Sequence, residues 1–305
     1  MPRKRKLGIA AAALLGLAAG AGRAAAQQPT PTRVPAPANK PVQSPGNAIW
    51  AETPADARAR AAKEKKLVFI EFDRKDCGYC QRMDALLYPA FDFEALLLSM
   101  VPVKVEFNSP AGKELALRYG VEDTPAILIT SPEGRMAFLM QGFTAAPDFY
   151  LHARQDLKAY RDFVRKIERQ DLSRLGAREA YDTGRELWQR SDPASARPRL
   201  QRALVAPKGT AKLRDAALEL LAAVELDLGQ TASSRETINR LIAVTKDAEK
   251  REEAEIFRAQ IPLAENKPQE AFDLFQKFRK DHPRSKHLAK VDAFLARMTG
   301  PPPSQ

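Results

Sequence analysis

Two cysteines separated by two residues are the side chains with the clearest capacity for covalent chemistry. Cys77 and Cys80 form the motif Cys-Gly-Tyr-Cys, and no other cysteine occurs among the 305 residues. A pair at this spacing can be a redox couple, supply half of a metal site, or arise by chance. Since no further cysteine is available, the pair does not belong to a larger framework of structural disulfides.

A metal site is the less favoured use of this pair. Zinc prefers four ligands, and the chain has three histidines, His152, His282 and His287. Two of them lie far along the chain, in a segment of different composition. We therefore expect no bound metal.

The surrounding sequence places the pair at the start of a helix. Residues 67–72 form a short apolar run typical of a buried strand, and Cys77 opens the helical segment that follows a charged loop. The free N–H groups and the positive dipole end of a helix N-terminus lower the pKa of a thiol placed there. Cys80 lies one turn further on, within reach to resolve a mixed disulfide formed by Cys77.

The elements on either side alternate between helix and strand. Thr53-Pro54 is typical of a helix start, so we expect a helix to residue 66. Strands are expected at 67–72, 101–107, 126–130 and 135–140, although Pro102 limits the beginning of the second. Further helices are expected from Cys77, and at 91–100, 113–119 and 146–166. This order predicts a mixed sheet covered by helices on both faces.

Residues 67–160 resemble a thioredoxin-fold domain. The resemblance rests on the strand leading into Cys77-Gly78-Tyr79-Cys80, on Gly120-Val121-Glu122-Asp123-Thr124-Pro125 before the third strand, and on Gly134 and Gly142. It implies a thiol–disulfide oxidoreductase with an α/β thioredoxin fold. Such an enzyme needs no cofactor, because electrons pass through the disulfide itself. Its partners would be protein dithiol or disulfide substrates and a thiol electron donor.

The resemblance also implies roles for single residues. Cys77 attacks, Cys80 resolves, and Gly78, Tyr79, Thr124 and Pro125 contact the substrate. The Thr124–Pro125 bond is then cis and packs against the cysteine pair, with an ordinary trans bond before a strand as the alternative. The Gly-Tyr pair and Thr124 resemble the reductase and isomerase branch, so we expect reduction or isomerisation of disulfides rather than oxidation.

Two acidic residues near the pair have different expected roles. Glu71 lies where thioredoxins keep a buried carboxylate; there its pKa would be raised and it could take the proton from Cys80. The alternative is a side chain that reaches solvent at a strand end. Asp76 departs from the family, which usually has Trp directly before the first cysteine. Asp76 opposes a thiolate whereas Arg74 and Lys75 favour it, so their combined effect is left open.

The N-terminal residues are typical of a secretory signal peptide. Arg3-Lys4-Arg5-Lys6 precedes an apolar stretch from Leu7 to Ala21, and Ala24-Ala25-Ala26 offers a cleavage site. We expect residues 1–26 to be a signal peptide and the protein to be exported, most plausibly to the periplasm, with secretion or an uncleaved anchor as alternatives. Residues 27–47 contain six prolines and are expected to be a Pro-rich linker.

The basic composition does not indicate nucleic-acid binding. The formal charge is +11, and five of the basic residues belong to the segment expected to be removed. Elsewhere, basic and acidic residues alternate along helical segments rather than forming a patch. After signal cleavage no apolar stretch is long enough to span a membrane.

The C-terminal part is expected to be all-helical. The thioredoxin-like domain is expected over 48–165, helices over 166–297, and a disordered tail over 298–305. Three triplets share one helix face each: Ala196, Leu200, Ala203; Ser234, Ile238, Leu241; and Ala271, Phe275, Phe278. Their spacings of 38 and 37 residues resemble tetratricopeptide repeats, which would dock a protein partner; a plain helical bundle is the alternative.

A non-enzymatic scaffold protein of the cell envelope, with a redox-sensitive thioredoxin-like domain, is the alternative function.

Overall fold

The computed structural model describes residues 49–87 and 91–299. The expected signal peptide 1–26, the linker 27–47 and most of the expected tail lie outside these ranges. The chain divides into two units, one with residues up to 133 and 138–155, the other with 134–137 and residues from 156 onward. Within the described ranges, no helix combines the length and apolar character needed to cross a bilayer.

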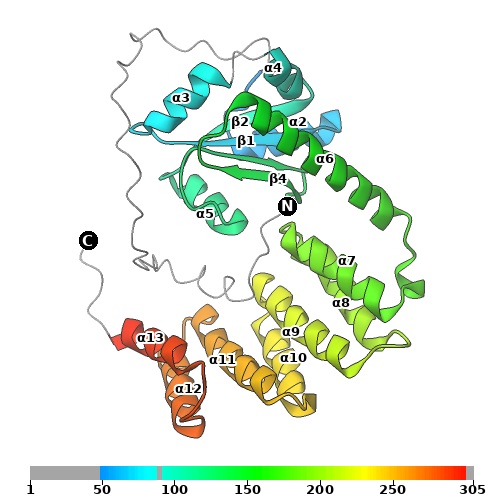
Figure 1. Ribbon diagram of the computed structural model, residues 1–305, viewed down its shortest axis with the longest axis vertical. Coiled ribbons are helices and arrows are strands. Elements are labelled where there is room, and N and C mark those ends of the chain that lie inside the picture. The colour runs from blue at the N-terminus through cyan, green and yellow to red at the C-terminus, as the bar shows by residue number, and fades with distance from the viewer. Residues whose placement is uncertain (1–48, 88–90, 300–305) are drawn as a thin grey trace. The chain divides into compact units, whose positions relative to one another are not determined.

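A mixed sheet forms the centre of the first unit (Figure 1). Its strands are β1 (Leu67–Asp73), β2 (Met100–Glu106), β3 (Ala126–Thr130) and β4 (Met136–Gln141), in the order β2-β1-β3-β4. Strand β1 is parallel to β2 and antiparallel to β3. The expected mixed sheet is therefore confirmed, with each strand within one residue of its predicted bounds.

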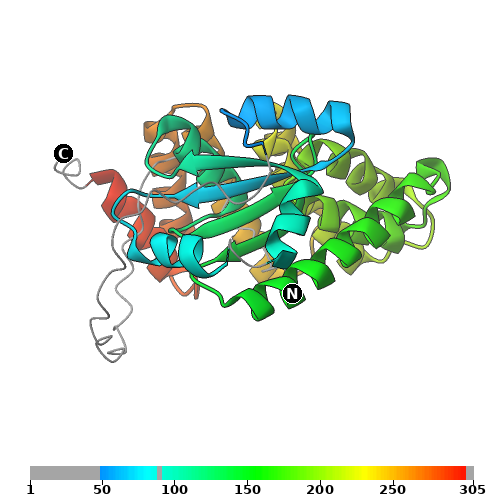
Figure 2. The same cartoon turned by 90° about the horizontal axis from the view of Figure 1, so that it is seen from above.

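Helices cover both faces of this sheet. They are α2 (Pro54–Glu64), α3 (Gly78–Leu86), α4 (Phe91–Leu98), α5 (Pro110–Tyr119) and α6 (Ala146–Glu168). Figure 2 shows α2 on one side of the strands and α3 and α6 on the other. This arrangement confirms the α/β thioredoxin fold expected for the first unit.

Local capping explains where two of these helices begin. The Thr53 hydroxyl accepts a hydrogen bond from the Asp56 N–H at 3.1 Å, as the Thr-Pro signal predicted. Ser109 caps α5 in the same way, through the Gly112 N–H at 3.0 Å. Helix α5 therefore starts at Pro110, three residues earlier than expected.

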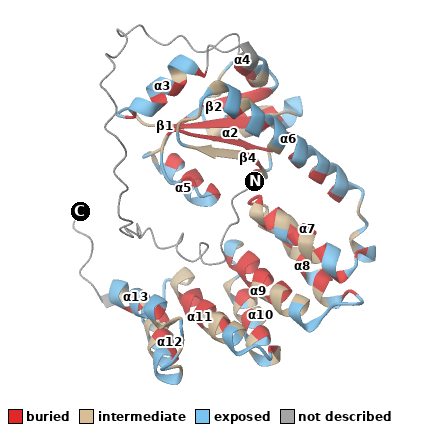
Figure 3. Ribbon diagram, in the orientation of Figure 1, coloured by how far each residue is buried: buried red, intermediate tan, exposed pale blue. Residues whose placement is uncertain are grey.

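The core of the first unit contains a row of aromatic rings. Phe69 of β1 contacts Phe93 of α4, with ring centroids 5.6 Å apart, and Phe93 contacts Phe149 of α6 at 5.8 Å. Phe149 in turn meets Phe138 of β4 at 5.7 Å. All four rings are buried, and Figure 3 shows the burial concentrated in the strands. This row fixes α4 and α6 on the sheet face that also carries the side chain of Glu71, two residues along β1 from Phe69.

Pro102 lies inside β2 rather than limiting its start. Its Cα pairs with that of Phe69, and its carbonyl accepts a hydrogen bond from the Ala51 N–H at 2.8 Å. Strand β2 is an edge strand of the four-stranded sheet. Proline can therefore occupy it without removing a hydrogen bond between two central strands.

The second unit is all-helical over its described residues from 156 onward. After a short 3-10 turn, η1 (Leu172–Arg174), successive helices pack against one another. They are α7 (Ala177–Gln189), α8 (Pro193–Val205), α9 (Ala211–Asp227), α10 (Thr231–Val244), α11 (Ala248–Ala264), α12 (Pro268–Asp281) and α13 (Leu288–Thr299).

The three triplets predicted to share a helix face are the buried residues of α8, α10 and α12. Helices α7 and α9 also contact each other, as do α9 and α11, so alternate helices pack side by side. The helical spacing in the sequence thus predicted which side chains would be covered. The assignment of these helices to tetratricopeptide-like repeats stays a prediction.

Candidate active site

Cys77 and Cys80 form a disulfide at the N-terminus of α3, with an S–S distance of 2.08 Å. Cys77 is the N-cap residue, and its Sγ accepts a hydrogen bond from the Cys80 N–H at 3.0 Å. The helix N-terminus thus directs an N–H group at this sulfur, which favours a thiolate once the bond is reduced. Both cysteines are nearly buried, with 5% and 2% of their surface exposed.

The peptide bond between Thr124 and Pro125 is cis, as the resemblance implied. Two hydrogen bonds hold the backbone on either side of it. The Thr124 N–H donates to Asp123 Oδ1 at 2.8 Å, and the Pro125 carbonyl accepts from the Gly142 N–H at 2.8 Å. Gly142 has a φ of +85°, a conformation that glycine adopts without strain.

Tyr79 presents an aromatic surface next to the disulfide. Its side chain is among the exposed large hydrophobic groups, at 54%, and its ring centroid lies 6.4 Å from that of Phe143. The Arg82 guanidinium lies over the Phe143 ring at 5.5 Å. Phe143 was missed as a candidate, although its position directly after Gly142 could have pointed to it. Gly78, in contrast, leaves open space where a Cβ would be.

Glu71 is fully buried in β1 rather than turned to solvent. Its Oε1 lies 3.2 Å from Nζ of Lys104, the residue paired with it across the parallel strands β1 and β2. Lys104 was not singled out from the sequence. The available signal was a lysine at an alternate position within the apolar strand Val101–Val105.

Lys104 joins three carboxylates beneath α3. Its Nζ is also 3.4 Å from Asp84 and 3.6 Å from Asp73. Burial alone would lower the pKa of Lys104, but Glu71, Asp84 and Asp73 outweigh it and raise that pKa. Burial raises the pKa of Asp84, and nearby Lys104 only partly offsets it. The buried carboxylate of Glu71 therefore belongs to a small cluster of charged side chains centred on Lys104.

Asp76, the residue in place of the family's usual tryptophan, is exposed and forms an ion pair. Its Oδ1 lies 2.8 Å from the Arg74 Nε. The positive charge of Arg74 is therefore partly neutralised by Asp76, which reduces its stabilisation of a Cys77 thiolate. Lys75, the other nearby cation, has an exposed side chain.

One group of possible metal ligands occurs among the described residues, away from the cysteines. Oxygen and nitrogen atoms of Glu249, Glu253 and His287 lie within 4.8 Å of one another. The two carboxylates already form ion pairs, with Lys286 and Lys250 respectively. These ammonium groups already pair with both carboxylates of the group.

Comparison with known proteins finds a family model that matches part of the first unit. Residues 54–155 match the family model described as thioredoxin-like domain. No curated protein matches the chain.

Three solved structures are among those similar to this chain. A thioredoxin from Thermus thermophilus has 28% sequence identity and a TM-score of 0.33, covering 35% of this chain and 85% of that one. DsbH oxidoreductase has 19% identity and a TM-score of 0.33, covering 42% and 95%. The oxidised C-terminal domain of DsbD from Neisseria meningitidis has 24% identity and a TM-score of 0.31, covering 36% and 99%.

A disulfide-bonded pair of cysteines at a helix N-terminus, on a sheet of this topology, supports thiol–disulfide oxidoreductase chemistry. The family match covers the same sheet and both cysteines. Residues 54–155 of this chain are therefore a thioredoxin-like domain.

Proposed function

We propose that this protein is an exported thiol–disulfide oxidoreductase that reduces or isomerises disulfides in other proteins. The Cys77–Cys80 disulfide at the start of α3 is the observation that carries the proposal. Export rests on the signal-like sequence of residues 1–26. An oxidising compartment outside the cytoplasm is where protein disulfides persist and need such an enzyme.

The reaction begins with the reduced pair. The Cys77 thiolate attacks one sulfur of a substrate disulfide, which breaks that S–S bond and forms a mixed disulfide. Cys80 loses its proton to Glu71 and attacks Cys77 Sγ, and the two substrate thiolates take up the proton held by Glu71 and one from solvent, so that the substrate leaves as a dithiol. The substrate gains two electrons and two protons, and the Cys77–Cys80 disulfide is then reduced by a thiol donor.

Four residues around the disulfide are proposed to contact the substrate. Gly78 leaves space for an approaching backbone, and Tyr79 offers an exposed aromatic ring. Thr124 and Pro125 would lie along the substrate chain, in the manner of an added strand. The preference for reduction or isomerisation rests on the Gly-Tyr and Thr-Pro pairs.

Two cysteine variants test the proposed reaction. Cys77→Ser should abolish reduction of a protein disulfide, because it removes the attacking sulfur. Cys80→Ser should accumulate mixed disulfides through Cys77, since the resolving sulfur is missing; non-reducing gel electrophoresis detects them. If Cys77→Ser keeps the wild-type rate, or if Cys80→Ser traps no substrate, the oxidoreductase proposal is wrong and the scaffold alternative gains support.

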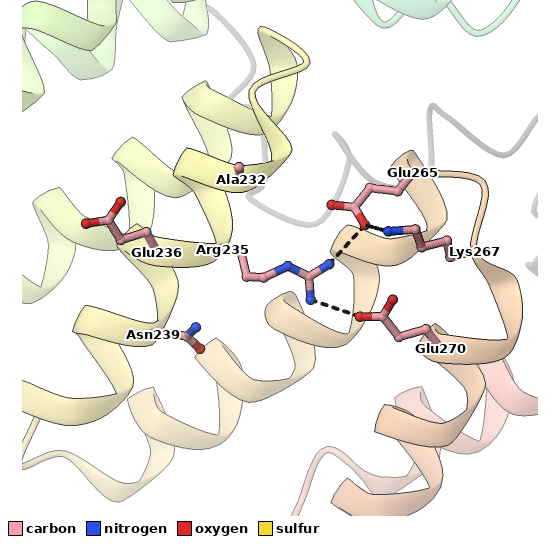
Figure 4. Close-up of a pocket in the computed structure, with 7 residues that line it drawn as sticks. All are labelled: Ala232, Arg235, Glu236, Asn239, Glu265, Lys267 and Glu270. Carbon is pink, nitrogen blue, oxygen red and sulfur yellow. Dashed lines mark hydrogen bonds and ion pairs between the residues drawn. The ribbon is translucent and has the colours of Figure 1, made fainter.

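The helical unit is proposed to dock a protein partner. A shallow pocket of about 560 Å³ lies along α10 and the α11–α12 connection (Figure 4). Arg235 crosses it, with its guanidinium 3.1 Å from Glu265 and 3.0 Å from Glu270. Alternating charges along such a surface suit recognition of a complementary polar protein face.

Reversing one charge tests this docking role without touching the cysteines. Arg235→Glu should leave reduction of a small peptide disulfide unchanged and slow reduction of the physiological protein substrate. Arg154→Glu, on the exposed face of α6, is the matched control. Equal rates for both variants on both substrates would contradict docking at this surface.

A further inference from the structure

Arg74 contacts both segments that form the proposed site. Its carbonyl accepts a hydrogen bond from the Cys77 N–H at 3.1 Å, so its backbone is part of the turn that leads into α3. Its guanidinium reaches across to the segment before the cis bond, where Nη1 lies 3.3 Å from Asp123 Oδ1. One residue therefore joins the attacking cysteine to the Thr124–Pro125 segment.

A single carboxylate oxygen completes this connection. Asp123 Oδ1 accepts a bond from Arg74 and also one from the Thr124 N–H, at 2.8 Å. The orientation of the Thr124 peptide thus depends on where Asp123 is held. The Arg74 N–H donates to Asp73 Oδ1 at 2.7 Å, which ties the arginine to the end of β1.

The planar guanidinium group of Arg74 can bind two carboxylates at once. Nε binds Asp76 at 2.8 Å while Nη1 binds Asp123, so the planar group holds two carboxylates in fixed directions. The Asp76 and Asp123 side chains are 79% and 71% exposed, whereas that of Arg74 is 33% exposed. Ion pairs this exposed contribute little to folding stability, so we expect their removal to leave the fold intact.

We infer that Arg74 is a positioning residue that holds the Thr124–Pro125 segment in register with Cys77 by bridging Asp76 and Asp123. This inference rests on the proposed function. Loss of the bridge should loosen the substrate-binding segment while both cysteines remain in place. The expected consequence is weaker binding of protein disulfides rather than loss of the fold.

Kinetics of the full chain test the bridge. Arg74→Ala should raise KM for a protein disulfide by about 3- to 10-fold, with a smaller change in kcat. Asp123→Ala should raise KM at least as much, because it also removes the acceptor of the Thr124 N–H, and the double variant should fall short of the sum of the two single effects, since both remove the Arg74–Asp123 contact. Arg74→Lys should recover only part of the loss, because an ammonium cannot reproduce the planar guanidinium. Arg154→Ala, an exposed arginine of α6, should match wild type.

A second measurement does not require enzymatic turnover. Alkylation of reduced Cys77 as a function of pH reports its thiolate. Removing Arg74 leaves the Asp76 and Asp123 carboxylates uncompensated, so Arg74→Ala should slow alkylation at neutral pH by about 2- to 5-fold. Lys75 and the Glu71, Asp73, Asp84 and Lys104 cluster are unchanged in every variant, so they cannot produce a difference between Arg74→Ala and Arg154→Ala.

The outcomes separate this inference from the proposed function. If Arg74→Ala equals Arg154→Ala in both KM and alkylation, or if the effects of Arg74→Ala and Asp123→Ala simply add, the bridge is wrong even though the enzyme works. If the wild-type chain reduces no protein disulfide, the proposed function fails, and the alkylation profiles alone decide whether Arg74 acts on Cys77.

Discussion

At the scale of single residues, the reactivity of Cys77 depends on the N–H groups around its sulfur and on the charges in the adjoining loop. The helix N-terminus favours the thiolate, and Arg74 offsets the carboxylates of Asp76 and Asp123. Below α3, the buried carboxylate of Glu71 forms an ion pair with Lys104, whose side chain is 39% exposed, and the proposed proton transfer from Cys80 would use this carboxylate. Two tests of this residue-level chemistry follow.

Glu71→Gln should slow disulfide reduction by at least about 10-fold, because the amide cannot accept the proton that leaves Cys80. The volume and hydrogen-bonding shape of the side chain are kept. Steady-state rates over a range of pH measure the effect. Asp84→Asn serves as the control, since it changes a neighbouring carboxyl and leaves Glu71 in place. A Glu71→Gln rate equal to wild type would exclude the proposed proton transfer.

Asp84→Asn should also change how stability depends on pH. Burial raises the pKa of Asp84 above its ordinary value of 3.8, so the folded state favours its protonated form. The associated stability is present below pH 3.8 and is lost as pH rises through the folded pKa. Asparagine stays neutral, so the variant should have the higher Tm at pH 7, with the difference shrinking toward pH 3.5. A difference that grows as pH falls would contradict this interpretation.

At the scale of elements, the sequence predicted the strands and the buried helix faces well, because both follow from short-range periodicity. It placed 126–130 as a strand and selected the buried triplets of α8, α10 and α12. The early start of α5 was missed, although Ser109-Pro110 repeats the Thr53-Pro54 signal. The partners of Lys104 and Arg74 were not predicted. The contact of Lys104 with Glu71 depends on the register of β1 and β2, and Arg74 and Asp123 lie in loops 49 residues apart in the chain.

Gly112→Ala should destabilise the first unit by about 2–4 kcal/mol. A Cβ at this position would lie 2.1 Å from the Glu106 carbonyl oxygen and 2.7 Å from that of Phe107. These are backbone atoms at the end of β2, so α5 or β2 would have to move. Urea denaturation measures the loss. Gly176→Ala, where nothing lies near the new methyl group, is the control; because Gly176 is the N-cap of α7, its cost should be no more than about 1 kcal/mol.

At the scale of the whole molecule, each unit buries its own apolar side chains. The aromatic row around Phe93 serves the first unit, and a cluster including Leu187, Leu200 and Ile238 serves the second.

Calorimetry of the full chain should show two unfolding transitions, because two separate cores give two cooperative units. Gly112→Ala should lower one of them. Leu187→Ala should lower the other, since the Leu187 side chain is fully buried in the apolar cluster of the second unit. If both variants instead shift a single shared transition, the two units fold as one.

The equilibrium redox titration of Cys77–Cys80 in glutathione buffers, on the full chain, tests the central claim most directly. A reductase should have a potential toward that of thioredoxins at about −270 mV, and an isomerase one toward that of protein disulfide isomerase at about −180 mV. A potential near about −120 mV, typical of strong disulfide donors, would contradict the proposed direction. A pair that never cycles in the buffer range would contradict the oxidoreductase function itself.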